Sequence, residues 1–364
     1  MTKRTVRRST KIAVIAAIGA SSLLLAACSS SSSSSTATST TPAAKKIAVS
    51  LITKDSTNPF FVAMQGGAKK AAADLGVDIT IASGKAEGDD AGQIAAIENA
   101  ISAKQQGILI TPMSTGVNDA MKKARAAGLF VIALDTPPDP PSTVDITFAT
   151  DNREAGHLIG QYAAAKLGGK KAVIALLDIF NDKIVSVDYN RDQGFLEGMG
   201  IPVNDPKKNG DEAKTGKYSG GTYKICGNEA TGANEEGGRT GMEKLLVKCP
   251  DINVVYTINE PTAAGASAAL KAAGNKAMIV SVDGGKAGVE NVKSGVIAAT
   301  SQQYPLKMAS LGVQAIFDLI TKGTKPAVSP GLDFFNTGVN LITANPATGV
   351  PSKDVQFGLD NAWG

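Results

Sequence analysis

Residues 47–61 read IAVSLITKDSTNPFF, and this stretch decides the fold class. The apolar, β-branched run over 47–52 predicts a buried strand. Asn58 suits the N-cap of a helix and Pro59 its first position, so we expect a helix over 60–75. A strand joined to a helix by a few polar residues is the repeating unit of a parallel α/β sheet.

The same alternation continues along the chain in two series. In the first series, strands are predicted over 77–82, 108–111, 130–134 and 146–150, with helices over 91–104, 117–127 and 155–167. In the second, strands are predicted over 172–177, 254–258, 278–282 and 296–301, with helices over 191–199, 235–247, 262–273 and 287–293. No flexible linker separates the series, so the sequence predicts two doubly wound parallel-sheet lobes joined by ordered crossings. The stretch 203–228, rich in Gly, Lys and Asn, predicts an inserted loop or hairpin.

The first 27 residues have the composition of an export signal. Five basic residues precede an apolar run over 12–27 that is short for a membrane span. Leu25-Ala26-Ala27-Cys28 resembles the lipobox of bacterial lipoproteins, which implies that residues 1–27 are removed and Cys28 becomes a lipid-anchored first residue. Residues 28–44 are rich in Ser and Thr and predict a flexible tether. The alternative is an ordinary secretory signal with an incidental Cys; either way we expect an extracytoplasmic protein.

Removing the signal changes the charge balance. The whole chain has 37 basic and 33 acidic residues and a net charge of +4. The signal holds five basic and no acidic residues, so the remainder carries 32 against 33, a net charge of −1. A chain so balanced offers no basic surface for nucleic acid.

Two cysteines remain beside Cys28. Outside the cytoplasm, Cys226 and Cys249 favour a disulfide, with two buried free thiols as the alternative. The chain has one His, His157, and no Cys-x-x-Cys or His-x-x-His spacing, so we expect no metal site and no cofactor.

Polar residues follow several of the predicted strands. Asp135 comes after 130–134, Asn259 after 254–258 and Asp283 after 278–282. Ligands of open parallel sheets bind beyond the carboxyl ends of the strands, although each of these residues also suits a helix cap. If the two sheets face each other across a cleft, these side chains converge, and Arg191 and Gln303 add donors.

The helix start after the first strand lies at the same edge. Asn58 can bind a ligand as well as cap the helix, and Phe60 or Phe61 can offer a ring face. Carboxylates accept from hydroxyls, Arg donates in a fixed fork, and amides do both. The sequence therefore predicts a site for a neutral polyhydroxylated molecule.

From residue 45 to about 345 the chain resembles the periplasmic sugar-binding proteins of ribose-type ABC importers. The resemblance rests on Asn58-Pro59-Phe60-Phe61, Asp135, Arg191 in an Arg-x-x-Gly-Phe motif, the Asn259 segment, Asp283-Gly284 and Gln303-Tyr304-Pro305, which occur in this order. It implies a type I binding-protein fold, with three crossings near 151–152, 301–303 and 335–338 and the ligand in the interlobe cleft. It implies lobes formed by 45–151 with 303–335 and by 152–302 with 336–364. It also implies a monomer that delivers a monosaccharide to an ABC permease and its ATPase.

Two departures bear on the sugar. Thr136 stands where ribose binders carry Arg, which argues against a plain ribose site. Lys54 stands where allose-type relatives carry a ligand-contacting Lys, which favours a hexose. Asp135-Thr136-Pro137, the insert and the Cys pair look most like the fructose-binding branch, with a pentose, another monosaccharide or a sugar alcohol as alternatives. Second-tier ligand candidates are Thr136, Asp151, Asn152, Asp178 and Asp182.

Other classes of protein fit less well. The chain has no Gly-x-Ser-x-Gly elbow and no phosphate-binding Gly-x-x-x-x-Gly-Lys-Ser/Thr loop, so we expect no enzyme and no catalytic residues. The two-lobed fold also occurs in transcription regulators, but those carry a DNA-binding headpiece where this chain has a signal and tether. A sensor subunit that presents bound ligand to a membrane receptor is the remaining alternative.

Overall fold

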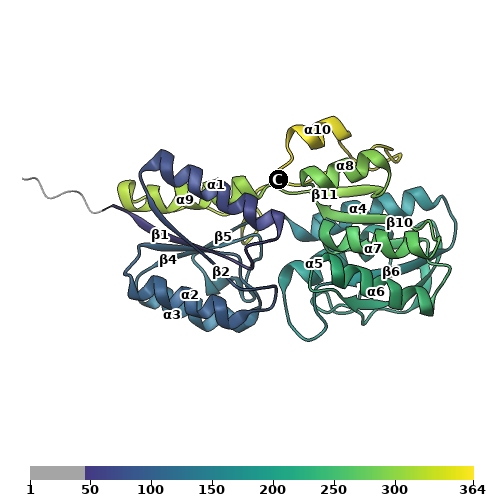
Figure 1. The fold of residues 1–364 in the computed structure, drawn as a ribbon, viewed down its shortest axis with the longest axis horizontal. Helices are drawn as coiled ribbons and strands as arrows, with labels where there is room; N and C mark the ends of the chain where they lie inside the picture. The colour runs from purple at the N-terminus through teal and green to yellow at the C-terminus, as the bar shows by residue number, and fades with distance from the viewer. Residues whose placement is uncertain (1–45) are drawn as a thin grey trace, which may run out of the picture. The chain divides into compact units, whose positions relative to one another are not determined.

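The computed structural model describes residues 46–364, which lie in one compact unit over 45–364. The signal peptide, Cys28 and the tether lie outside the described residues. Two sheets organise the unit, and each is covered by helices on both faces (Figure 1). We call the sheet that contains β1, with its helices, the first lobe, and the sheet that contains β6, with its helices, the second lobe.

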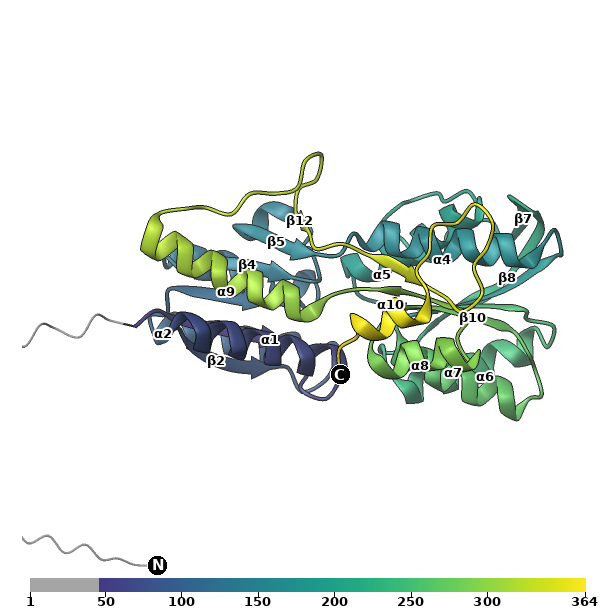
Figure 2. The same ribbon diagram turned by 90° about the horizontal axis from the view of Figure 1, so that it is seen from above.

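The first lobe is built on a six-stranded parallel sheet with the order β12-β5-β4-β3-β1-β2. Its strands are β1 Ala48–Thr53, β2 Asp78–Ser83, β3 Gly107–Ile110, β4 Phe130–Leu134, β5 Ile146–Ala149 and β12 Phe335–Asn336. Its helices are α1 Pro59–Leu75, α2 Asp90–Ser102, α3 Asn118–Ala126 and α9 Pro305–Lys322, with 3-10 turns η1 Thr115–Val117 and η2 Pro141–Thr143. Helices α1 and α9 lie side by side on one face (Figure 2), and α2 and α3 cover the other (Figure 1).

The second lobe is built on a seven-stranded sheet with the order β13-β11-β10-β9-β6-β8-β7. Its strands are β6 Ala172–Asp178, β7 Thr215–Tyr218, β8 Gly221–Ala230, β9 Val254–Thr257, β10 Met278–Asp283, β11 Ala299–Gln302 and β13 Asn340–Ile342. Only the edge strands β7 and β13 run antiparallel to their neighbours. Its helices are α4 Asn152–Leu167, α5 Ser186–Met199, α6 Glu235–Lys248, α7 Glu260–Ala272, α8 Lys286–Ser294 and α10 Val355–Asp360.

Three short passages connect the lobes. The chain passes from β5 to α4 over 150–151, from β11 to α9 over 303–304, and from β12 to β13 over 337–339. These passages lie at the three places expected from the resemblance. The fold class predicted from the sequence is therefore confirmed: two doubly wound lobes, mainly parallel, joined by ordered crossings.

The stretch 203–228 is more than an insertion. It contains the hairpin of β7 and β8, and β8 continues to Ala230 as an inner strand of the second sheet, parallel to β6. The sequence prediction missed this strand because its Gly, Lys and Asn content resembles a loop. Tyr218, Tyr223 and Ile225 nevertheless bury their side chains in the core.

The end of the chain also differs from the prediction. Residues 336–364 were assigned to the second lobe, and β13 and α10 do pack there. Trp363, however, belongs to the core of the first lobe, where its ring packs edge-on against Phe60 with centroids 5.4 Å apart. Its indole N–H donates to the carbonyl of Gln303 at 2.9 Å. The C-terminus therefore crosses back to the first lobe.

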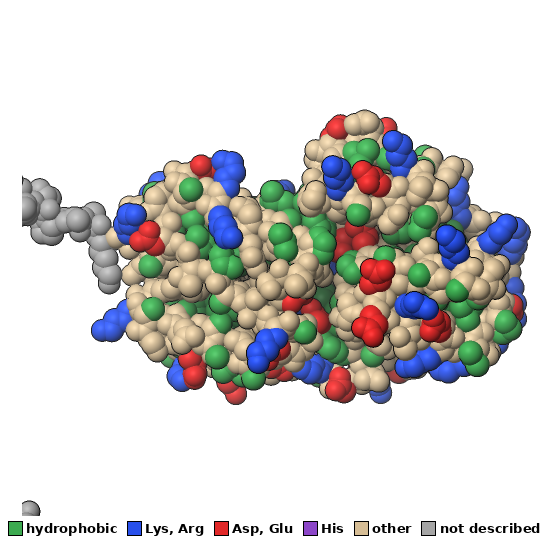
Figure 3. Space-filling view, in the orientation of Figure 1, with side chains coloured by type: hydrophobic (Ala, Val, Ile, Leu, Met, Phe, Trp, Pro, Cys, Tyr) green, Lys and Arg blue, Asp and Glu red, His purple; other side chains and the backbone are tan. Residues whose placement is uncertain are grey.

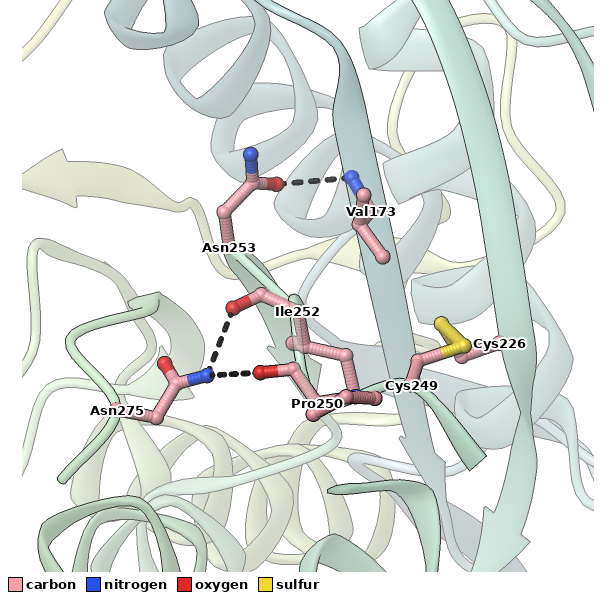
Figure 4. The surroundings of a disulfide bond; sticks show 7 residues. All are labelled: Val173, Cys226, Cys249, Pro250, Ile252, Asn253 and Asn275. Atoms are coloured by element: carbon pink, nitrogen blue, oxygen red, sulfur yellow. Dashed lines mark hydrogen bonds between the residues drawn. A yellow bond between two sulfur atoms is a disulfide. The ribbon is translucent and has the colours of Figure 1, made fainter. Parts of the chain in front are cut away.

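A disulfide joins Cys226, on β8, to Cys249, the residue that ends α6 (Figure 4). The turn after Cys249 is held on both sides by side-chain hydrogen bonds. The Asn253 side chain accepts from the Val173 N–H at 2.8 Å, and the Asn275 amide donates to the carbonyls of Pro250 and Ile252. The bond thus ties the hairpin to the helix layer of the second lobe.

Within 46–364, no helix combines the length and the apolar character needed to span a bilayer. Acidic and basic side chains are interspersed on the face drawn in Figure 3, as the near-zero charge of the chain without its signal leads one to expect.

Candidate functional site

The candidate site is a small cavity between the strand ends of the two lobes. From the first lobe it is lined by Lys54, Asn58, Phe60, Phe61, Glu87 and Asp135. From the second lobe and the crossings it is lined by Ile179, Val187, Arg191, Ala233, Ile258, Asn259, Asp283 and Gln303. All nine principal candidates from the sequence therefore line one cavity.

Two aspartates enter the cavity from strained turns. Asp135 follows β4 with a φ of 63°, and Asp283 ends β10 with a φ of 146°. Both values lie in a region that residues with a side chain rarely adopt. Such strain persists where the surrounding structure demands it, which is common at functional sites. Here it turns the chain at the end of one strand in each lobe.

Arg191 links the two lobes from the middle of α5. Its Nε donates to Asn152 Oδ1 at 2.8 Å, one Nη donates to the Ile258 carbonyl at 3.0 Å, and the other lies 3.6 Å from Asp135 Oδ1. The side chain is 5% exposed. Asp135 Oδ1 has no hydrogen-bond partner, so this oxygen is free to accept from a ligand.

Asp283 is held by groups of its own lobe and of a crossing. Gln303 Nε2 donates to Asp283 Oδ1 at 2.8 Å, and the Glu260 N–H donates to Asp283 Oδ2 at 3.3 Å. Burial raises the pKa of Asp283 to about 6, although Arg191 and Gln303 act to lower it. Both oxygens of this carboxyl group accept hydrogen bonds in the structure.

Lys54 forms a buried ion pair with Glu87, a residue that the sequence analysis missed. The Lys54 Nζ lies 2.9 Å from Glu87 Oε1, and the two side chains are 3% and 9% exposed. Burial raises the pKa of Glu87, and Lys54 opposes the shift. The sequence offered one signal for such a residue, namely Lys54, because a buried ammonium needs a counterion.

An aromatic corner closes one side of the cavity. Asn58 caps α1 by accepting from the Phe60 N–H at 3.0 Å, as predicted from Asn58-Pro59. Phe60 and Phe61 pack edge-on, with centroids 5.4 Å apart. Because Phe60 is also packed against Trp363, the corner is rigid.

Asn259 combines capping with cavity lining. Its Oδ1 accepts from the Thr262 N–H at 3.0 Å and its Nδ2 donates to the Ala233 carbonyl at 2.9 Å. Asn259 therefore caps α7 and lines the cavity at the same time, which are the two roles considered for it from the sequence. Ala233 is one of four apolar lining residues that sequence reasoning missed; the set is Ile179, Val187, Ala233 and Ile258.

The second-tier candidates do not line the cavity. Thr136 donates to Asp135 Oδ2 at 2.8 Å, and Asn152 donates to the Asp135 carbonyl at 3.2 Å. Both residues therefore position Asp135, which lines the cavity. Asp151 is taken up in capping α4, where it accepts from the Glu154 N–H at 3.0 Å.

Asp178 and Asp182 lie elsewhere. Asp178 ends β6 but is buried inside the second lobe, where its Oδ2 accepts from Asn228 at 2.9 Å. Asp182 is exposed in the loop between β6 and α5. The strand-end rule placed both too close to the ligand, because it does not say toward which side a loop turns.

The cavity is nearly balanced in charge. Two cations, Lys54 and Arg191, face three carboxylates, Glu87, Asp135 and Asp283. Together with apolar walls and the amides of Asn58, Asn259 and Gln303, this arrangement suits a small neutral molecule with hydroxyl groups. An anionic ligand would add a charge that the cavity cannot pair.

Fold and cavity define a two-lobed ligand-binding protein. The sequence profile of the periplasmic binding protein domain matches residues 47–325. The chain therefore belongs to the periplasmic binding protein family.

Relatives and solved structures agree with this assignment. The ribose import binding protein of Haemophilus influenzae is 32% identical over 280 residues, which cover 77% of this chain and 86% of that protein. An ABC transporter solute-binding protein of Agrobacterium vitis with bound D-fucose is 26% identical, covers 81% of this chain and 95% of its own, and has a TM-score of 0.68. A second solute-binding protein of Agrobacterium vitis, bound to α-D-tagatopyranose, has a TM-score of 0.71 at 21% identity over 88% of this chain and all of its own; it shows the fold alone.

Proposed function

We propose that this chain captures a monosaccharide outside the cytoplasm and delivers it to an ABC importer. The observation that carries the proposal is the convergence of Asp135, Arg191 and Asp283 from both lobes on one small cavity. The ribose import relative and the D-fucose-bound structure support a sugar as the ligand. No enzyme activity is proposed, because the relatives are binding proteins of transport systems.

The two lobes provide the mechanism. A sugar that touches Asp135 in the first lobe and Arg191 and Asp283 in the second binds the closed arrangement more tightly than an open one. That difference in affinity shifts the lobes toward closure about the three crossings. The permease then distinguishes the loaded protein from the empty one by its shape.

Recognition comes from hydroxyl groups that satisfy buried polar atoms. Asp135 Oδ1 and Gln303 Oε1 are buried without a hydrogen-bond partner, so each can accept from a sugar hydroxyl. The rings at the aromatic corner cover the apolar C–H face of a sugar. A sugar that lacks one of these hydroxyls leaves a buried oxygen unpaired and loses affinity.

We favour a hexose, with fructose as the leading candidate. The Lys54–Glu87 pair supplies both a donor and an acceptor, and Lys54 stands where the resemblance gives allose-type relatives a ligand-contacting Lys. Thr136 stands where it gives ribose binders an Arg. Ribose, another pentose or a sugar alcohol is the alternative, and the identity of 32% to a ribose import protein favours ribose among these.

A thermal-shift screen followed by calorimetry tests the proposal. The panel contains fructose, allose, ribose, arabinose, mannitol and a sugar phosphate. A ligand that binds only the folded protein raises its melting temperature, and we expect the largest rise with fructose and none with the sugar phosphate. A larger rise with ribose would contradict the fructose assignment; no rise with any sugar would contradict sugar binding. Chemical conversion of any bound sugar would point to an enzyme instead.

We further propose that lipid on Cys28 anchors the protein to the cell membrane. The lipobox-like Leu25-Ala26-Ala27-Cys28 supports this. Membrane fractions should contain the wild-type protein with the mass of a lipidated Cys28, and Cys28→Ser should lose both the added mass and the membrane association. Equal membrane recovery of Cys28→Ser would reject the anchor.

A further inference from the structure

The last four residues of the chain, 361–364, extend from α10 to the boundary between the lobes, and we call them the C-terminal strap. Helix α10 is fixed to the second lobe. Gly358 lies so close to Ile342 and Val289 that no side chain would fit there, and its carbonyl accepts from Gln302 Nε2 at 2.8 Å. From this base the strap carries Trp363 toward the first lobe, and Figure 2 shows the C-terminus between α1 and α8.

The ring of Trp363 contacts both lobes. It packs edge-on against Phe60 of the first lobe, with centroids 5.4 Å apart and an interplanar angle of 78°. It also lies against Gly285 of the second lobe, where an added Cβ would come within 3.1 Å of ring carbon Cζ3. Trp363 is 6% exposed, so the two lobes together remove it from water.

The polar groups of Trp363 bind the second lobe and a crossing. Its carbonyl accepts from the N–H of Lys286, the first residue of α8, at 2.9 Å. Its indole N–H donates to the carbonyl of Gln303, in the crossing from β11 to α9, at 2.9 Å. The ring, in contrast, packs in the apolar core of the first lobe. If the lobes separate, the hydrogen bonds keep Trp363 with the second lobe, and its ring leaves Phe60.

Both neighbours of the ring are close to the ligand. Phe60 itself lines the cavity. Gly285 follows two residues after Asp283, and the Glu260 carboxylate accepts from the Gly285 N–H at 3.1 Å, which holds this turn in place. Trp363 is not among the lining residues. Its influence on a ligand is therefore exerted through Phe60 and the Asp283 turn.

We propose that Trp363 is a positioning residue for sugar binding, an inference that rests on the proposed function. Its ring aligns the aromatic corner of the first lobe with the Asp283 turn of the second. Because the indole is out of water only while both lobes enclose it, its burial stabilises the closed arrangement. A sugar that requires this arrangement binds more tightly when the arrangement is more populated. Since the ring does not touch the sugar, the gain is the same for every sugar that fits.

Trp363→Ala tests the inference, with fructose and ribose as the probes. We expect the affinity for each sugar that the wild-type protein binds to fall by about tenfold, with the ratio between the two sugars kept within about twofold. Calorimetry measures the affinities. Stopped-flow kinetics should show that most of the loss is faster release, because the open form is reached more easily.

Phe130→Ala is the matched control for lost stability. Phe130 packs against the same apolar core as Trp363, but it begins β4, whereas Asp135 follows the opposite end of that strand. The control should lower the melting temperature and leave sugar affinity within about twofold of the wild type, because it leaves the contact between the lobes intact. Trp363→Phe keeps an aromatic ring beside Phe60 and should lose less than about threefold in affinity.

Gly285→Ala provides a second variant that keeps Trp363, should Trp363→Ala fail to fold. The φ of Gly285 is −67°, which any residue adopts, and the added Cβ would crowd the ring from the second lobe. We expect about threefold weaker binding and faster release with little change in melting temperature.

The outcomes separate this inference from the proposed function. Unchanged affinity and release in Trp363→Ala, or in Gly285→Ala if the former does not fold, would overturn the inference while the wild-type protein still binds sugar. A loss of affinity in Phe130→Ala equal to that in Trp363→Ala would also overturn it, because general destabilisation would then explain both. A wild-type protein that binds no sugar would contradict the proposed function itself.

Discussion

The sugar cavity and the buried carboxyl groups of Asp178, Asp192 and Glu212 in the second lobe, which we call the buried acidic cluster, are two polar interiors. They are built from the same residue types, yet they differ in how their charges are paired. In the cavity, Lys54 faces Glu87, and Arg191 lies against Asp135. In the cluster, Glu212 pairs with the half-exposed Lys214, whereas Asp178 and Asp192 form no ion pair within residues 46–364. A balanced interior can close over a neutral guest, whereas buried carboxyl groups without a cation tend to keep their protons.

Arg191→Ala should have the largest effect, because it unbalances the cavity in the manner of the cluster. It leaves the Asp135 carboxylate and the Asn152 amide oxygen without their partner. Removing one member of a buried ion pair costs about 3 kcal/mol or more, so sugar affinity should fall by about 100-fold. Calorimetry measures this, with the partly exposed Arg125→Ala of the Arg125–Asp145 pair as control. A loss no greater than that of the control would remove Arg191 from the site.

Asp283→Ala comes next. The change leaves Gln303 Nε2 without its acceptor and removes a carboxylate that faces the ligand. We expect sugar affinity to fall by about tenfold or more, corresponding to about 2 kcal/mol. The exposed Asp119→Ala, whose carboxylate pairs only with Lys122 on the surface, is the matched control. Unchanged affinity in Asp283→Ala would contradict its assignment as a ligand residue.

The pH dependence of stability should separate the cluster from the cavity. Raised pKa values of Asp178 and Asp192 mean that the folded protein keeps protons that the unfolded chain has released above the ordinary Asp value of 3.8. Their contribution to stability is therefore complete below that value and is lost as pH rises. The free energy of unfolding should therefore fall by about 1 kcal/mol or more per pH unit as the pH rises through the range in which these carboxyl groups titrate.

Urea unfolding of the wild-type protein and of Asp192→Asn between pH 5 and 8 measures this slope. The variant has one carboxyl group fewer in the cluster and should show the shallower slope. Equal slopes in the two proteins would argue against a proton retained on Asp192.

Lys207→Ala should have the smallest effect. Its ammonium lies 2.7 Å from Asp139 Oδ2, a contact between the second lobe and the first, but the two side chains are 56% and 26% exposed. Exposed ion pairs contribute little and are screened by salt, so sugar affinity should fall at most about threefold at low salt and not at all at high salt. Lys70→Ala, from a pair within α1, serves as control. A tenfold loss would show that partly exposed charges between the lobes also control closure.

Much of the cavity was predictable because strand ends and ligand positions coincide in this fold. Asp135 follows β4, Asn259 follows β9 and its neighbour Ile258, and Asp283 ends β10, so the strand pattern alone grouped them. Lys54 was found only through the resemblance to sugar-binding proteins. That Lys54 needed a buried partner could also have been argued.

Glu87 could not be located from the sequence in the same way. It lies in the stretch Lys85-Ala86-Glu87-Gly88-Asp89, which looks like an ordinary solvated loop. Nothing local distinguishes Glu87 from Asp89, which caps α2. The difference arises only when β1 brings Lys54 beside that loop, a contact 33 residues apart in sequence.

The cluster escaped prediction for a related reason. Asp178, Asp192 and Glu212 come from three segments that only the folded sheet brings together. Glu212 lies in the stretch 203–228, which the sequence assigned to a surface loop, and its side chain is nonetheless fully buried. Patterning predicts which elements form, but not which polar side chain of a loop turns inward.

The position of Trp363 makes the intrinsic fluorescence of the protein a probe of ligand binding. It is the single tryptophan of the chain, its ring touches Phe60 and its N–H binds the carbonyl of Gln303, and both partners line the sugar cavity. Emission excited at the red edge of indole absorption should therefore report occupancy without any attached dye. For the same reason, a tag fused directly after Gly364 would sit one residue from Trp363 and should be separated from it by a linker.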